Sequence, residues 1–166
     1  LLLITKENLG LETITLYLFF YALSTLGAFA VVAYLEEKNQ KGLTLEQITG
    51  LNEKNKPMAF MMSVFLLSMA GIPLTSGFIG KYGLFNFAVN EGAVPLVIVA
   101  VLTSAISVYY YLRVIIFMYM KPSTKNLEIN TSLWGAKLIA LVLSIVTIVF
   151  GVFPQIAIEF VKRISH

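Results

Sequence analysis

Long runs of uncharged, mostly apolar residues alternate with short charged connections along the chain. A helix of about 20 apolar residues crosses the hydrocarbon core of a bilayer. Helices are favoured there because every backbone polar group must find its partner within the segment. The pattern therefore predicts an all-α, polytopic transmembrane bundle of four helices. The expected spans are about 13–35, 57–90, 93–120 and 134–154.

The second run is too long for one straight crossing. As a single helix, residues 57–90 would measure about 50 Å against a core of about 30 Å. Residues 71–77 read Gly-Ile-Pro-Leu-Thr-Ser-Gly, in which proline removes a backbone donor and glycine allows unusual dihedrals. We therefore expect one discontinuous helix, broken near 71–77. A kink that serves packing alone is the alternative.

Lys81 is the one charged residue of this run and follows the predicted break directly. A lysine near the bilayer centre costs about 2.5–3.5 kcal/mol on insertion scales. Broken helices expose free carbonyl groups that form ion sites in transporters, and burial favours the neutral amine, which allows proton exchange. A transport role is thus favoured over snorkelling of Lys81 to the headgroups. The residues expected to support it through the break are Gly71, Pro73, Thr75, Ser76, Gly77 and Gly80.

The remaining polar residues of the spans are weaker candidates. Arg113 lies near the end of the third span, where an arginine that stays protonated serves as an anchor or counter-ion. Single hydroxyls in membrane helices usually serve packing, although they can also bind water or neighbouring helices. The hydroxyls concerned are those of Ser68, Thr75, Ser76, Ser104 and Ser107. None of the four spans contains an acidic residue, so Lys81 has no carboxylate partner within them.

Composition excludes several classes of function. The chain is 58% hydrophobic and only 13% charged, too little charge for the surface of a soluble domain. It has no cysteine and one histidine, His166, which excludes thiolate-held iron–sulfur clusters and zinc fingers. The net charge of +3 comes from residues in the connections, so it does not indicate a nucleic-acid partner. We expect no cofactor and no metal in this chain.

The charges of the connections predict an orientation. Basic residues gather in the connections 36–56 and 121–137, which the positive-inside rule places in the cytoplasm. Within the first connection, Thr44–Leu51 has the pattern of a short interfacial helix that starts with a capping box. Residues 155–166 are predicted to form an amphipathic tail. Leu1–Ile4 has the character of the end of an earlier helix, so we expect an N-terminal part that is missing here.

Three stretches of sequence carry a family resemblance. Residues 68–81 read Ser-Met-Ala-Gly-Ile-Pro-Leu-Thr-Ser-Gly-Phe-Ile-Gly-Lys, and the stretches 21–30 and 109–114 agree with the same family. The chain resembles the antiporter-like membrane subunits of respiratory complex I, the bacterial NADH–quinone oxidoreductase. The resemblance implies the last four of fourteen helices in a fold of two inverted repeats. Lys81 would be the ionisable residue of the discontinuous helix in the second repeat.

The resemblance also implies a function. The chain would be a proton-translocating subunit of the inner (plasma) membrane, in which Lys81 couples electron transfer elsewhere in the complex to proton pumping. NADH, FMN, iron–sulfur clusters and quinone would be handled by other subunits. Its partners would be the other membrane-arm subunits, the lipid bilayer and protons. A subunit of a multisubunit Na⁺/H⁺ antiporter, which uses the same motif, and a structural membrane scaffold are the alternatives.

Overall fold

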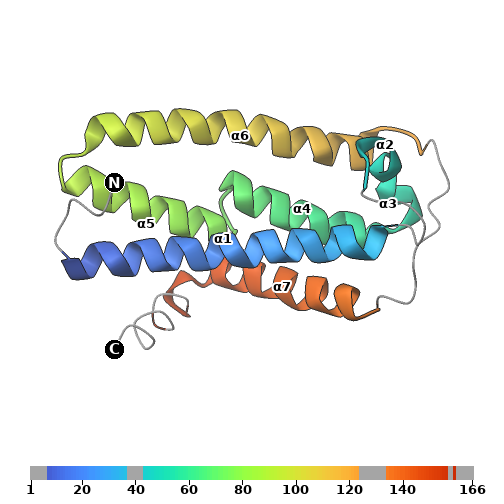
Figure 1. Cartoon of the computed structure of the whole chain (residues 1–166), viewed down its shortest axis with the longest axis horizontal. Helices are drawn as coiled ribbons and strands as arrows, with labels where there is room; N and C mark the ends of the chain where they lie inside the picture. The colour runs from blue at the N-terminus through green and yellow to red at the C-terminus, as the bar shows by residue number, and fades with distance from the viewer. Residues whose placement is uncertain (1–6, 37–42, 124–133, 157–158, 160–166) are drawn as a thin grey trace.

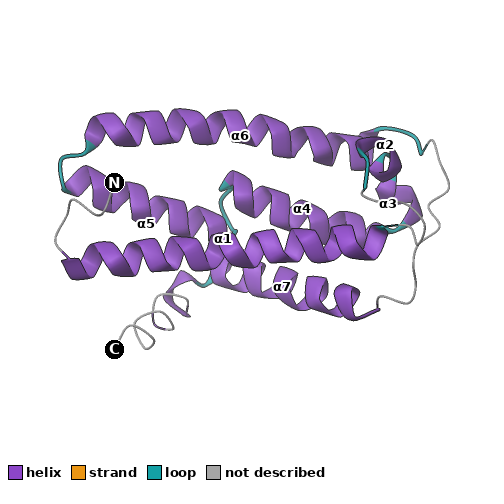
Figure 2. Cartoon of the chain, viewed as in Figure 1, coloured by secondary structure: helices purple, strands orange, loops and turns teal. Residues whose placement is uncertain are grey.

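The computed structural model describes residues 7–36, 43–123, 134–156 and 159, and within these ranges the regular elements are all helices. The prediction of an all-α membrane bundle with one discontinuous helix is confirmed (Figure 2). The helices are α1 (Glu7–Leu35), α2 (Leu45–Ile48), α3 (Leu51–Lys54), α4 (Lys56–Ala70), α5 (Ser76–Asn90), α6 (Val94–Met120) and α7 (Trp134–Val152).

Some predictions fall on other parts of the chain. The expected helix end at Leu1–Ile4, residues 37–42 and 124–133 of the two connections, and most of the tail 155–166 lie outside the described residues. In place of one interfacial helix over Thr44–Leu51, the structure shows two single turns, α2 and α3, which are separated by Thr49 and by Gly50 in the left-handed conformation. The predicted capping box is present, because the Thr44 N–H donates to Gln47 Oε1 over 2.7 Å.

Four membrane crossings can be traced along the bundle. Within the described residues, α1, α6 and α7 are each long and apolar enough to span a bilayer. The fourth crossing consists of α4 and α5, which follow one another along the bundle axis (Figure 1). Each has 15 residues, which is about 22 Å of helix. Neither is long enough to cross the hydrocarbon core of the bilayer alone, but the two together are.

The two half-helices lie at the centre of the bundle. In Figure 1, α4 and α5 run between α6 on one side and α1 with α7 on the other. Helix α1 packs along both half-helices and along α7, and α6 packs mainly on α4. The core beside α4 is fully buried and apolar, with Val31, Leu35, Met58, Phe65 and Met118. By contrast, most side chains of α6 are exposed, as expected for a helix that faces lipid or further helices.

Helix α4 ends in a glycine-dependent cap. Gly71 has φ +80°, and its N–H donates to the carbonyl oxygens of Ser68 (2.9 Å) and Leu67 (3.0 Å). The Ile72 N–H also donates to the Leu67 carbonyl oxygen, over 3.0 Å, which completes a Schellman motif. Glycine adopts this left-handed conformation at little steric cost. The cap therefore stops α4 at Ala70, before Pro73 is reached.

The unwound stretch is shorter than the sequence predicts. Thr75 is the extended residue before α5, and its Oγ1 donates to the Ile72 carbonyl oxygen over 2.6 Å. Ser76 and Gly77 belong to the first turn of α5, so the break covers residues 71–75 rather than 71–77. Leu74 lies inside it with φ +72°, a conformation that is rare for a side chain of this size.

Candidate functional site

The Lys81 side chain reaches back from α5 to the end of α4. Its Nζ donates to the carbonyl oxygens of Met69 (2.9 Å) and Ala70 (3.2 Å) and to Ser104 Oγ (2.8 Å) of α6. A protonated lysine has three N–H donors and no acceptor. All three donors are therefore satisfied at the break, and the half-buried side chain joins α4, α5 and α6 at one point.

The break supplies two of these acceptors because it ends a helix. The last carbonyl groups of a helix have no partner within it, and they form the negative end of its dipole. Met69 and Ala70 are the last two residues of α4, so their carbonyl oxygens are available to the ammonium group. Among the described residues, the protonated lysine is stabilised by these backbone dipoles and the Ser104 hydroxyl, and not by a carboxylate.

Gly71 is needed for the site as well as for the helix cap. A Cβ atom at residue 71 would lie 2.8 Å from Lys81 Cδ, closer than side-chain carbons pack. Any larger residue would therefore have to displace the lysine side chain, in addition to straining the positive φ angle. The glycine predicted from the sequence as part of the break thus also makes room for Lys81.

Three buried serines hold the two half-helices against α1. Ser24 Oγ of α1 lies 2.8 Å from Ser68 Oγ of α4, which lies 3.5 Å from Ser76 Oγ of α5. The Gly77 N–H also donates to Ser68 Oγ, over 3.1 Å. All three side chains are almost fully buried. Ser68 is the centre of this cluster and satisfies a backbone donor in the first turn of α5.

We expect Ser68→Ala to destabilise the protein by about 1–3 kcal/mol, because it leaves the buried Ser24 hydroxyl and Gly77 N–H without their partner. Thermal unfolding of the detergent-solubilised protein measures the change. Ser63→Ala is the matched control, since Ser63 lies on the same helix and its hydroxyl bonds the carbonyl oxygen of Ala59. Equal stability of the two variants would contradict the role of Ser68 in holding the two half-helices against α1.

Two further glycines let backbones approach closely around the break. A Cβ atom at Gly80 would lie 3.2 Å from the Cα atom of Tyr17, so Gly80 sets the contact between α5 and α1. A Cβ atom at Gly151 would overlap the backbone of Leu74 and Thr75, so α7 packs directly on the unwound stretch. The break is thereby enclosed by α1 and α7 on the side away from α6.

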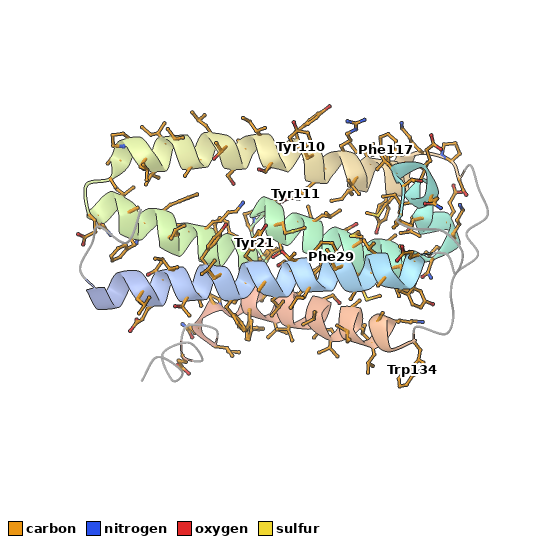
Figure 3. The ribbon with its side chains drawn as sticks, in the orientation of Figure 1. Tyr21, Phe29, Tyr110, Tyr111, Phe117 and Trp134 are labelled. Carbon is orange, nitrogen blue, oxygen red and sulfur yellow. The ribbon has the colours of Figure 1, made fainter. Side chains whose placement is uncertain are left out.

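A small cavity adjoins Lys81 on the α1 side. Its volume is about 10 Å³, roughly the space of one water molecule. Tyr17, Tyr21, Ser24 and Ser68 are among the residues that line it with Lys81. In Figure 3, the Tyr21 and Tyr111 side chains lie between α1 and α6 near the break. The cavity is lined mainly by apolar atoms, and the side-chain partner of Lys81 is Ser104.

Arg113 lies apart from this site. It is exposed on α6, nine residues beyond Ser104, a rise of about 13 Å along the helix. Its Cζ lies 5.8 Å from the ring centroid of Phe117, and Lys121 Nζ lies 3.5 Å from the same centroid (Figure 3 labels Phe117). This position suits an anchor near one end of α6 better than a counter-ion of Lys81.

The site contains one partner that the sequence does not reveal. The sequence places Ser104 among several hydroxyls whose usual role is packing and does not single it out, yet it binds Lys81 of another helix, 23 residues away. No local motif links the two residues. Within the described residues, no group of three or more histidine, cysteine, aspartate or glutamate side chains is placed to hold a metal ion.

A discontinuous membrane helix whose free carbonyl groups face a cationic side chain is a feature that this bundle shares with many membrane transporters. The chain belongs to the NADH:quinone oxidoreductase/Mrp antiporter transmembrane family, which matches residues 1–107.

Individual relatives agree with this family. The chain is 38% identical over 159 residues to NADH-quinone oxidoreductase subunit N of Rhodococcus opacus, covering 95% of this chain and 29% of that protein. It is 41% identical over 142 residues to subunit N of Bdellovibrio bacteriovorus, covering 86% of this chain and 29% of that protein. A chain of respiratory complex I from Thermus thermophilus with bound aureothin has a similar fold, with a TM-score of 0.77 and 28% identity. The match covers 89% of this chain and 34% of that one. The chain thus spans about three-tenths of the length of these curated relatives.

Proposed function

We propose that this chain is part of a proton-translocating subunit of an NADH–quinone oxidoreductase and that Lys81 is its proton carrier. The observation that carries the proposal is the Lys81 ammonium, bound at the break by the carbonyl groups of Met69 and Ala70 and by Ser104. A carrier must hold its proton in the membrane and still release it. A site made of dipoles rather than a full negative charge suits both demands, because no ion pair has to be broken.

The mechanism follows from the charge of the lysine. Redox energy released elsewhere in the complex would reach this subunit as a change of charge or conformation at a neighbouring ionisable group. A positive charge placed near Lys81 disfavours the ammonium, and its removal favours proton uptake again. Alternation between the two states moves one proton through residue 81. The neighbouring ionisable group would come from the rest of the protein, since the partners of Lys81 among the described residues are two carbonyl groups and a hydroxyl.

The proposed location of the protein is a bacterial inner membrane. The chain is an integral membrane protein, and the basic residues of the connections 36–56 and 121–137 favour a cytoplasmic position for both. Its partners would be the other membrane-arm subunits, the lipid bilayer and the transported protons. NADH, FMN, iron–sulfur clusters and quinone would bind to other subunits, so this chain would contribute translocation and no redox chemistry.

The experiment that tests the proposal separates transport from electron transfer. Lys81→Ala is introduced into the full-length subunit, and quinone reduction and proton translocation are measured in membrane vesicles after the amount of assembled complex has been determined. The proposal requires that proton translocation falls in an assembled complex. Full translocation in that complex would leave Lys81 with a structural role. Translocation that depends on Na⁺ would instead favour the antiporter alternative.

A further inference from the structure

The three partners of the Lys81 ammonium group are chemically unequal. Met69 and Ala70 contribute carbonyl oxygens, which only accept hydrogen bonds, whereas Ser104 contributes a hydroxyl, which both accepts and donates. After the ammonium has lost a proton, the neutral amine has a lone pair that needs a donor. Ser104 is the one partner that can supply it. It is also the one partner through which a proton can pass.

The Ser104 hydroxyl differs from its neighbours on the same helix. Thr103 Oγ1 donates to the carbonyl oxygens of Val99 and Ala100, and Ser107 Oγ donates to that of Thr103, each over 3.0 Å. Ser104 Oγ instead accepts from Lys81 over 2.8 Å. Among the described residues its own hydrogen has no acceptor, and the side chain is half-buried rather than sealed. That hydrogen can therefore be donated to a water molecule.

We propose that Ser104 is the proton relay of Lys81. In the release step, the N–H bond from Lys81 Nζ to its transferred proton breaks, and that proton bonds to Ser104 Oγ. In the same step Ser104 gives its original hydrogen, as a proton, to an adjacent water molecule. Lys81 becomes a neutral amine, the serine hydroxyl is restored, and the water carries the positive charge. Uptake is the reverse. The inference rests on the proposed function, since it assigns the path by which the carrier exchanges its proton.

The test compares proton translocation by assembled complexes in which one or the other of two α6 hydroxyls, that of Ser104 or that of Ser107, has been changed. Ser104→Ala keeps the small size but removes the relay, and we expect proton translocation to fall about a hundredfold, the lower end of the range for loss of a positioned proton-transfer group. Ser104→Thr retains a hydroxyl and should recover most of the rate. Ser107→Ala is the matched control, because that hydroxyl bonds its own helix and not Lys81. It should translocate at the wild-type rate.

A second measurement distinguishes proton relay through Ser104 from a role of Ser104 in packing alone. If proton transfer limits the Ser104→Ala variant, exchange of H₂O for D₂O should slow it more than it slows the wild type. A loss caused only by altered packing gives no such difference. The inference is overturned if assembled Ser104→Ala translocates at the wild-type rate, if Ser107→Ala is equally impaired, if threonine does not rescue, or if the solvent effect is unchanged. Normal translocation by Lys81→Ala would instead overturn the proposed function itself.

Discussion

Replacement of Lys81 by alanine is expected to reduce coupled proton translocation by at least about a hundredfold, the order expected when an essential acid–base group is removed. The substitution deletes the carrier and leaves the carbonyl groups of Met69 and Ala70 without their ammonium partner. Because inserting a charged lysine is itself costly, the variant should still enter the membrane and assemble. Proton uptake by vesicles, normalised to assembled complex, measures the effect.

Two other variants show whether proton translocation needs a residue 81 that can release its proton, or only a positive charge at that position. Lys81→Arg keeps a positive charge that arginine does not give up, so it should translocate as poorly as the alanine variant. Lys121→Ala removes a lysine that is exposed at the end of α6 and stacks on Phe117, and it should translocate normally. A functional arginine variant would mean that residue 81 acts as a fixed charge and not as a carrier.

A second large effect is expected at Gly77, where an added methyl group should destabilise the bundle by about 1–3 kcal/mol or more, the usual cost of overpacking. A Cβ atom at residue 77 would overlap the carbonyl group of Ser68, which is backbone and cannot turn aside. Gly77→Ala must therefore push α5 away from α4 and lengthen the bond from the Gly77 N–H to Ser68 Oγ. Thermal unfolding in detergent and the amount of subunit in the membrane measure the change.

The same helix provides the control for this prediction. A Cβ atom at Gly83 would make only an ordinary contact, 3.7 Å from Thr13 Cγ2. Gly83→Ala should therefore be neutral or stabilising, since alanine favours a helix interior over glycine by about 0.5–1 kcal/mol. If both substitutions destabilise the protein equally, the cost arises from glycine replacement in α5 in general and not from the contact with Ser68.

The sequence predicts the fold better than it predicts the contacts of the site. Uncharged runs of membrane length predict the bundle, because the bilayer requires them, and the Gly-Ile-Pro stretch predicts the break beside Lys81. Local chemistry also explains the helix cap at Gly71. These features depend on residues close in sequence or on the membrane itself.

What the sequence does not predict depends on how distant helices meet. The bond between Lys81 and Ser104 joins residues of two helices, and the contact between Ser24 and Ser68 joins residues 44 apart. A serine in a membrane helix has the same local appearance whether it bonds its own backbone, as Ser107 does, or a lysine, as Ser104 does. Only the three-dimensional packing distinguishes the two.

The backbone carbonyls that bind Lys81 have a consequence for how this site can vary in evolution. Two of its three partners are carbonyl groups of Met69 and Ala70, and these are present whatever side chains stand there. Point mutations at these two positions change volume but cannot delete the acceptors. The identity of the side chain therefore matters for the site mainly at Gly71, Lys81 and Ser104. Selection for proton transfer should act on the codons of these three residues.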